Sequence, residues 1–367
     1  MRVLVAPDAF DGTLTAPAAA RAIADGWLRR APDDQVTLAP MADGGHGFVD
    51  VLHVALGGEL RVLTVPGPHG APTPMTLLAH DGTVYVESTQ ACGPQLAGDG
   101  DPERGSSRGV GEAVAAALAM GPERVVVGIG GCATSDGGAG LLAALGATAD
   151  VPLDAGPSAL DGLTRIDATA AAAAARGVEL VVATDVTTVL LGMFGTTNVH
   201  GGSRGLDEDA RQRVDRVLDG YVDALCGRTP AERRVADAPG SGAGGGLGLA
   251  LMHLGATRRS GIEVVAEAVG LRDLAGAHDV VVTGEGAYDF SSREGKVAHA
   301  VAIVAGEAIR PCVVLAGRVL VGAREMRAMG VEAAYAVVDL VGEEAAVRDP
   351  AASLSTLATR VARTWSF

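Results

Sequence analysis

The sequence predicts an α/β fold in which a Rossmann-like parallel-sheet domain carries a second, inserted α/β domain with a mixed sheet. Three observations support this prediction. Runs of Val, Leu and Ala alternate with helical segments at both ends of the chain. The middle of the chain instead begins with short alternating runs separated by Gly and Pro, which are typical of antiparallel hairpins. The 52 glycines, many of them clustered, indicate ligand-binding loops at strand ends.

The amino-terminal elements predict a strand, helix, strand unit. Residues 2–6 form a continuous apolar run, typical of a central parallel strand, and the run ends next to Asp8. A helix is expected from a Thr N-cap at residue 15 through residue 29, with its apolar residues on one stripe. A second strand at 35–39 leads into another acid-bearing loop. This is the start of a Rossmann-like sheet.

The pattern changes between residues 59 and 88, where three short alternating runs predict antiparallel strands and the start of the second domain. Further along, a strand at 124–127 runs directly into the glycine-rich loop 128–140. The other elements expected in this part are a helix at 110–119, a helix from about 140, an alanine-rich helix at 170–175, a strand at 179–183, a helix at 207–225 and a second glycine-rich stretch from Pro239.

Strand and helix alternation resumes near residue 279, with strands expected at 279–282, 312–316 and 333–338. Two parallel strands at the start and three at the end make one sheet most naturally if the middle is an insertion. We therefore expect a ligand in the cleft between two domains. The predicted boundaries are 1–57 with 275–367 for the discontinuous domain, and 58–274 for the inserted one.

The composition excludes several classes of function. A net charge of −15 argues against a nucleic-acid partner or an anionic membrane surface, because both require a basic face. No apolar run is long enough to span a bilayer, and the first apolar run is too short for a secretory signal. The four cysteines are far apart and form no CxxC pair, so reduced thiols in a cytoplasmic protein are expected.

The stretch 280–296, VVVTGEGAYDFSSREGK, is the most informative part of the chain. A buried strand is followed by glycines that permit a sharp turn, and then by Glu285, Asp289, Arg293 and Lys296. Lys296 is the only lysine in the protein. A compact ammonium suits contact with a phosphate, whereas the alternative is a lysine retained by chance on a surface loop.

The two glycine-rich stretches predict anion binding by backbone amides rather than a dinucleotide site. GIGGCA at 128–133 fits GxGxxG only in part, no acidic residue follows at the expected distance, and no Walker loop is present. Amides and hydroxyls at a helix start favour negative charge, although tight packing turns are the alternative. The expected anion-binding residues are Gly130, Gly131, Thr134, Ser135, Asp136, Gly137, Gly244 and Gly245.

Carboxylates that follow strands form a second constellation, which predicts Mg²⁺-assisted phosphoryl transfer. One carboxylate would act as a base towards a hydroxyl, while others hold the metal. Taken singly, each could equally be an N-cap or turn residue. His46 is the histidine of interest, because it lies in a loop beside Asp43. The carboxylates are Asp8, Asp43, Asp136, Asp185, Glu285 and Asp289.

With these motifs in order, the chain resembles the type I glycerate kinases over essentially its whole length. The shared motifs are APD and FxGTL at 6–14, MADGG at 41–45, the loop at 128–140, TDV at 184–186, PGSGAGGGLG at 239–248, SGIE at 260–263 and TGEGxxD followed by GK at 283–296. The resemblance implies two α/β domains, the second inserted in the first, and transfer of the ATP γ-phosphate to a hydroxyl of D-glycerate with Mg²⁺.

The resemblance also implies roles for individual residues. Asp289 or Asp185 would be the base or a metal ligand, and Lys296 would meet the transferring phosphate. Asp43, Gly44 and Gly45 in the MADGG motif, with Asp8 and Glu285, would contact the substrate or its phosphates. Arg108, Arg204, Arg293 and Lys296 are the cations left for a triphosphate and a carboxylate. A homodimer is one option for the assembly.

Several positions depart from the family pattern. Ala9 and Asp11 replace a Ser and a Lys, and the second change puts an anion where a cation is expected. The other departures are His46 for Glu, Thr188 and Val189 for an Asn-Pro pair, and Ala287 for Arg. They leave open a catalytically lapsed paralogue that binds an organic acid or nucleotide as a sensor or partner protein.

Overall fold

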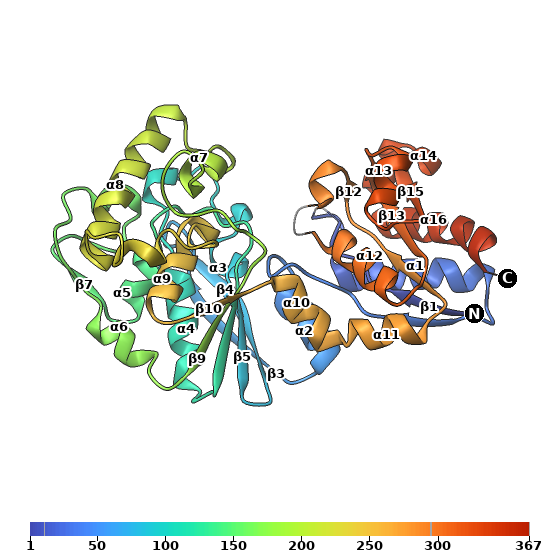
Figure 1. The fold of residues 1–367 in the computed structure, drawn as a ribbon, viewed down its shortest axis with the longest axis horizontal. Coiled ribbons are helices and arrows are strands. Elements are labelled where there is room, and N and C mark those ends of the chain that lie inside the picture. Colours follow the sequence, from blue (N-terminus) through green and yellow to red (C-terminus); the bar gives the residue numbers. More distant parts are fainter. Residues whose placement is uncertain (11, 294–295, 367) are drawn as a thin grey trace. The chain divides into compact units, whose positions relative to one another are not determined.

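The computed structural model describes residues 1–10, 12–293 and 296–366, which form two compact units (Figure 1). The first unit comprises Met1–Asp43, Asp50–Gly57 and Ile262–Phe367, and the second comprises Gly44–Val49 and Gly58–Gly261. Residues 262–274 thus belong to the first unit, whereas the boundary predicted from the sequence assigned them to the inserted domain. The reason is local, because the helices in this segment lead directly into the first unit's central strand.

The first unit is built on a five-stranded parallel sheet in the order β15-β13-β11-β1-β2. β1 (Arg2–Val5) lies between β2 (Gln35–Leu38) and β11 (Val280–Thr283), with Val3 opposite Val280. β13 (Cys312–Ala316) and β15 (Ala333–Ala336) complete it. The predicted parallel sheet, made from both ends of the chain, is therefore confirmed. The expected last strand is shorter than predicted, because a helix begins at Val337.

Helices α1 (Ala16–Arg30) and α16 (Pro350–Trp365) pack together beside this sheet. The Thr15 hydroxyl accepts a hydrogen bond from Ala18 N at 3.3 Å, so the predicted N-cap is present. Trp27 is fully buried and donates to Asp34 at 2.8 Å. The remaining elements are α2 (Phe48–Leu56), α10 (Gly261–Val269), α11 (Leu271–Ala277), α12 (Val297–Glu307), α13 (Ala323–Ala328), α14 (Val337–Val341), α15 (Glu343–Arg348), β12 (Ala287–Tyr288) and β14 (Arg318–Val319).

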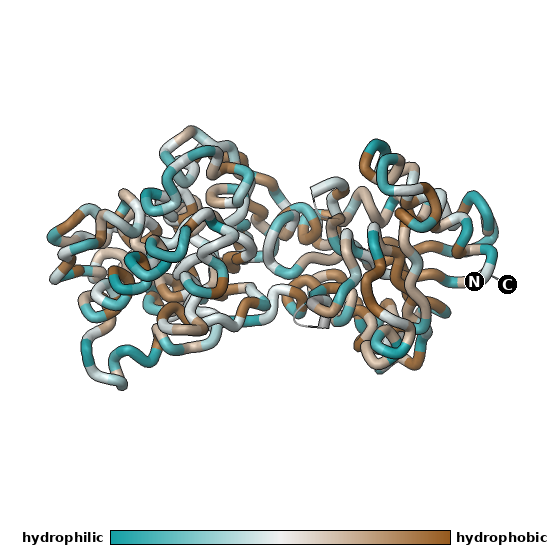
Figure 2. The backbone as a smooth tube through the Cα atoms, turned by 90° about the horizontal axis from the view of Figure 1, so that it is seen from above, coloured by the Kyte–Doolittle hydropathy of each residue, from teal (hydrophilic) through white to brown (hydrophobic). Residues whose placement is uncertain are grey.

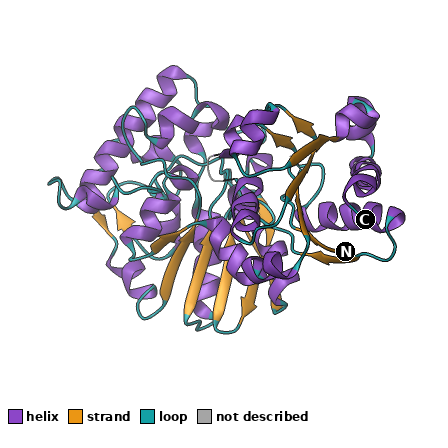
Figure 3. Ribbon diagram, turned by 45° about the vertical axis from the view of Figure 1, so that its right-hand side comes forward, coloured by secondary structure: helices purple, strands orange, loops and turns teal. Residues whose placement is uncertain are grey.

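The second unit is built on a mixed six-stranded sheet in the order β10-β9-β6-β5-β4-β3 (Figure 3). β3 (Glu59–Pro66), β4 (Pro72–His80) and β5 (Thr83–Glu87) are antiparallel neighbours, as the short alternating runs predict. β5, β6 (Arg124–Gly128), β9 (Glu179–Ala183) and β10 (Thr257–Arg259) pair in parallel. The predicted combination of a parallel sheet with a mixed sheet is thus confirmed.

The core of the second unit consists mainly of Val, Leu and Ala, as the low aromatic content requires. Figure 2 shows brown, hydrophobic stretches of the backbone alternating with teal, hydrophilic ones along the chain. In the described part of the chain, every helix is too short or too polar to cross a bilayer. The other elements of this unit are α3 (Thr89–Cys92), α4 (Arg108–Ala119), α5 (Ala139–Ala144), α6 (Thr169–Ala174), α7 (Thr196–His200), α8 (Glu208–Cys226), α9 (Leu247–His253), β7 (Thr148–Ala149) and β8 (Ile166–Asp167).

The contact between α1 and α16 depends on a glycine. A Cβ at Gly26 would lie 2.1 Å from the backbone oxygen of Ser355. We expect Gly26→Ala to lower the free energy of unfolding by about 1–3 kcal/mol, because the two helices must separate. Gly306→Ala in α12 is the control, since its Cβ would meet nothing within 4 Å. Chemical denaturation of both variants checks this, and equal stability of the two would contradict it.

Candidate functional site

In the first unit, acidic side chains gather where the central parallel strands end. Asp8 follows β1, and its backbone N–H donates to the Gly284 oxygen at 2.8 Å, just after β11. Glu285 is the next residue and is 6% exposed. The Met41 N–H donates to the oxygen of Pro7 at 2.9 Å, which holds the chain before Asp43 beside the same strand end. Open α/β sheets bind ligands at this edge.

The pKa of Asp8 is strongly affected by its surroundings. Burial raises its pKa well above the usual value, and the negative charges of Asp43 and Glu285 act in the same direction. The N–H of Ala9, at 2.7 Å, and the ammonium of Lys296 oppose the increase. A carboxyl with a raised pKa that faces other carboxylates is the type of group that accepts protons or metal ions at functional sites.

Lys296 lies between two predicted site carboxylates. Its ammonium is 3.8 Å from Glu285 Oε2 and 4.0 Å from Asp289 Oδ1, and the side chain is 37% exposed. Ser292 organises this cluster, because its hydroxyl donates to Glu285 Oε1 at 2.8 Å and accepts from the Asp289 N–H at 3.2 Å. The predictions for Asp11 and for the Arg293 side chain lie outside the described residues.

In the second unit, the two glycine-rich stretches pack directly against each other. The Gly137 N–H donates to Gly245 O at 3.0 Å, and a Cβ at Gly245 would lie 1.9 Å from the oxygen of Thr134. Gly244 is buried at φ +59°, a conformation that favours glycine. These glycines therefore permit close backbone packing, which was the alternative to anion binding.

Close packing also explains the glycines of the MADGG motif. A Cβ at Gly44 would lie 2.4 Å from the oxygen of Ala183 at the end of β9. A Cβ at Gly130, after β6, would lie 2.4 Å from the Cα of Gly45. Gly131 differs, because it is exposed and a Cβ there would meet nothing within 4 Å. Gly131 is thus the glycine of this loop that is open to a ligand.

Asp136 acts within the protein. It is fully buried, and its carboxylate accepts hydrogen bonds from the Ser107 N–H and hydroxyl, both at 2.8 Å, and from the Gly138 and Gly140 N–H groups. Burial raises its pKa, while these donors oppose the increase. This geometry favours a role in fixing the loop over the predicted contact with a ligand.

Arg204 is the cation that reaches the first glycine-rich loop. Its guanidinium donates to Cys132 O at 3.1 Å, to the Ser135 hydroxyl at 3.4 Å and to the Thr196 hydroxyl at 3.1 Å. Within residues 1–10, 12–293 and 296–366 it has no carboxylate partner, and burial lowers its pKa. A desolvated guanidinium whose partners are all neutral is suited to bind an anion.

The backbone around Arg204 adds further donors. In the described part of the chain, the N–H groups of Gly130, Gly131 and Cys132 have no protein acceptor. Successive free N–H groups are typical of anion-binding loops. Thr134 contributes less, because it is fully buried and its hydroxyl lies 3.5 Å from Gly244 O. Thr196 was missed by the sequence analysis, since nothing local predicts that a threonine at the start of α7 meets Arg204.

The remaining predicted residues divide into two groups. Asp185 follows β9 and accepts from the Ser260 hydroxyl at 2.6 Å, after the neighbouring β10. Arg108 is instead paired with Glu112 at 2.8 Å and with Asp154, so the geometry does not favour the predicted phosphate contact.

His46 Nδ1 lies 3.7 Å from Glu87 Oε1, and Glu87 is buried. Among the residues that the structure describes, no three His, Cys, Asp or Glu side chains form a metal cluster.

Comparisons with known proteins cover nearly the whole chain. The model of the glycerate kinase family matches residues 3–366. The chain is 35% identical to glycerate 2-kinase of Escherichia coli strain K12 over 351 residues, which covers 93% of this chain and 92% of the relative. An uncharacterized protein of Mycobacterium bovis is 38% identical over 371 residues, covering 99% and 91%.

A solved structure agrees with these sequence relatives. The chain aligns with a crystal structure of a protein assigned as glycerate kinase 2 in Salmonella typhimurium LT2 with a TM-score of 0.81 and 31% identity. The alignment covers 99% of this chain and 98% of that one.

The raised pKa of Asp8 predicts a pH-dependent cost to stability. Below the usual pKa of 3.8 both the folded and unfolded states hold the proton, so there is no cost. The cost grows as pH rises from this value to the higher folded pKa and is constant above it. We expect Asp8→Asn to raise the Tm at pH 8 by roughly 2–4 °C, with a smaller gain at pH 5. Asp25→Asn, on the exposed face of α1, should leave the Tm unchanged. A lower Tm of Asp8→Asn at pH 8 would refute the assignment.

Proposed function

The chain belongs to the glycerate kinase family, and we propose that it transfers the γ-phosphate of ATP to a hydroxyl of D-glycerate or a closely related small hydroxy acid. The observation that carries this proposal is the cluster after β1 and β11. There a lone lysine ammonium lies within 4.0 Å of two carboxylates, beside a carboxyl with a raised pKa. Phosphoryl transfer requires such positioned charges rather than covalent chemistry by the protein.

Lys296 and Asp289 have the central roles in this proposal. The Lys296 contacts of 3.8 and 4.0 Å are ion pairs longer than hydrogen bonds, so its N–H donors can turn towards the oxygens of a phosphate. Asp289 is the base towards the acceptor hydroxyl, or a metal ligand. Ser292 keeps Glu285 and the Asp289 backbone in place for these roles.

Arg204 with the free amides of Gly130, Gly131 and Cys132 is the anion-binding part of the second unit. A guanidinium binds a planar carboxylate through two parallel hydrogen bonds, and it also binds phosphate. Since the hydrogen bonds of Arg204 within the described residues all go to neutral oxygens, an anionic ligand would give this desolvated cation its first opposite charge. We propose that Arg204 binds either the carboxylate of the acid substrate or a phosphate of ATP.

The residues present fit Mg²⁺ as the ion that accompanies ATP. Asp8 has a pKa raised by burial and by Asp43, which indicates negative charge that a cation would relieve. Mg²⁺ in kinases is held by one or two carboxylates together with phosphates and water, so a cluster of three protein ligands is not required. Asp289 in the first unit is one candidate carboxylate, and Asp185 in the second unit is the alternative. Bound Mg²⁺ would shield the phosphate charge during transfer.

A second candidate is a lapsed paralogue that binds an organic acid or a nucleotide without turnover. The observation in its favour is the loss of cations, because Asp11 stands where the family has a lysine and Arg108 is already paired with two carboxylates. Ligand-dependent thermal stabilisation without ADP release would support this candidate. If the protein shows no ligand-dependent stabilisation and no turnover, both candidate functions are excluded.

Turnover tests the kinase proposal directly. We expect ADP release, measured by a coupled assay, only when Mg²⁺, ATP and D-glycerate or a related hydroxy acid are all present. Lys296→Ala should lower kcat by roughly 100-fold or more, because it removes the charge that stabilises the transferring phosphate. Arg318→Ala is the matched control, since Arg318 is an exposed cation of the same unit paired with Glu343. Full activity of Lys296→Ala would contradict the proposed role of Lys296 in stabilising the transferring phosphate.

Arg204 predicts a different kinetic signature. Arg204→Lys keeps the charge but loses the planar fork, so we expect KM for the acid or for ATP to rise by about tenfold with a smaller change in kcat. Arg211→Lys, a neighbouring arginine that pairs with Glu208, should behave like the wild type. Titration of each substrate separately identifies which anion Arg204 contacts. Unchanged KM values for both substrates would show that Arg204 is structural.

A further inference from the structure

A cavity of about 650 Å³ opens in the second unit at the β7–β8 hairpin. Thr148 and Arg165 line it from the hairpin, and α6 closes one side. Leu225 and His253 line it from the carboxyl-terminal ends of α8 and α9. Its volume falls in the range of sites for small metabolites. None of the residues assigned above to catalysis or anion binding lines this cavity.

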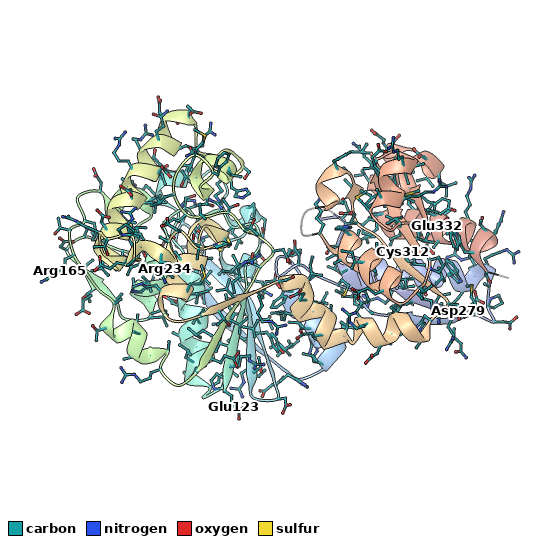
Figure 4. All side chains as sticks on the ribbon, in the orientation of Figure 1. Glu123, Arg165, Arg234, Asp279, Cys312 and Glu332 are labelled. Carbon is teal, nitrogen blue, oxygen red and sulfur yellow. The ribbon has the colours of Figure 1, made fainter. Side chains whose placement is uncertain are left out.

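Arg165 gives the cavity a positive charge that the protein balances only in part, through the nearby Asp167. Within the described residues, its guanidinium has no ion pair, whereas Arg124 and Arg213 are paired with glutamates. Figure 4 labels Arg165, which lies at the outer side of the second unit near β7. The cavity also has one carboxylate, Asp167, which accepts the Thr169 N–H at 2.9 Å. Hydrogen bonding to Thr169 lowers the pKa of Asp167, and the charge of Arg165 acts in the same direction.

His253 supplies the second polar group. Its Nδ1 lies 3.9 Å from the sulfur of Cys226, and burial lowers its pKa, so the ring is neutral near pH 7. Its Nε2 has no hydrogen-bond partner in the part of the chain that the structure describes. A neutral imidazole can therefore donate one N–H to a ligand oxygen without any repulsion of Arg165.

We propose that this cavity is an effector site for a small organic anion, bound through the guanidinium of Arg165 and the imidazole of His253. The ligand is a carboxylate or an organic phosphate, since both offer the planar or clustered oxygens that a guanidinium prefers. Thr148 lies in the same wall and offers a hydroxyl for a further oxygen.

The elements that end at the cavity begin at the candidate anion loops. α8 starts at Glu208, four positions after Arg204, and ends at Cys226 beside Leu225. α9 follows the second glycine-rich stretch and ends at His253. A ligand that fixes the ends of both helices would favour one arrangement of the loops at their beginnings, provided that it binds that arrangement more tightly.

Isothermal titration calorimetry of the full chain with citrate and with glucose 6-phosphate tests the binding and separates the two ligand chemistries, because the only anionic groups of citrate are carboxylates and the only one of glucose 6-phosphate is a phosphate. We expect one saturable site that persists in Arg204→Ala, weakens at least tenfold in Arg165→Ala and is unchanged in Arg176→Ala. Arg176 is an exposed arginine just beyond α6 that does not line the cavity. Three results would each overturn the site. They are the absence of saturable binding, equal affinities of Arg165→Ala and Arg176→Ala, and loss of binding in Arg204→Ala.

Hydrogen–deuterium exchange tests the effector role without relying on turnover. With the probe that binds, we expect exchange to slow at least threefold in peptides that cover residues 200–207 and 239–246, as well as around the cavity. Arg165→Ala should abolish all of these changes. Slower exchange around the cavity alone would show a binding site without an effector role, and that result would overturn this part of the proposal.

Discussion

The parallel pairing of β1 with β11 is the constraint on which the candidate catalytic cluster depends. It joins segments 277 positions apart, and the Thr283 hydroxyl reinforces it by donating to Ala6 O at 2.8 Å. Because parallel strands end at the same edge, the pairing forces Asp8 and Glu285 to leave the sheet side by side. Neither segment has a complete site by itself. The acidic cluster is therefore a consequence of sheet topology rather than of a local motif.

This acidic cluster lowers the stability of the fold, although the candidate function requires it. Burial and the charge of Asp43 make the ionised form of Asp8 unfavourable, and Lys296 relieves this only in part. A fold selected for stability alone would place an amide or an apolar side chain at this position. Retaining a carboxyl there is understandable if a ligand or a metal ion supplies the missing positive charge, because binding then recovers the energy that folding loses.

Much of the fold could be predicted from sequence, because its signals are local. Continuous apolar runs identified the buried parallel strands, and Thr15 identified the start of α1. β10 was missed, since Thr257–Arg259 is polar and is held as a strand only by its pairing with β9. The boundary near residue 275 was misplaced for a similar reason: helical periodicity does not show which sheet a helix covers.

The site was less predictable, because its chemistry depends on residues far apart in the sequence. Arg108 looked available until the structure paired it with Asp154, 46 positions away. Asp136 was expected to contact a ligand, yet Ser107, 29 positions earlier, supplies two of the donors to its carboxylate. No pattern in the sequence reveals such partners, so a charged residue in a loop could be proposed only as a candidate.

The glycine-rich stretches show how a shared motif can mislead about mechanism. Their glycines were expected to cradle an anion, but at Gly245 a Cβ would overlap the backbone of the other stretch at 1.9 Å. The glycines therefore serve mainly to let the two loops pack closely against each other. Fewer groups than predicted remain available to bind an anion. They are the exposed Gly131 amide, the neighbouring amides and the guanidinium of Arg204. Rigid packing beneath them holds those donors in place, so the buried glycines Gly244 and Gly245 would support anion binding by fixing the loop, while the amides of Gly130 and Gly131 would contact the anion.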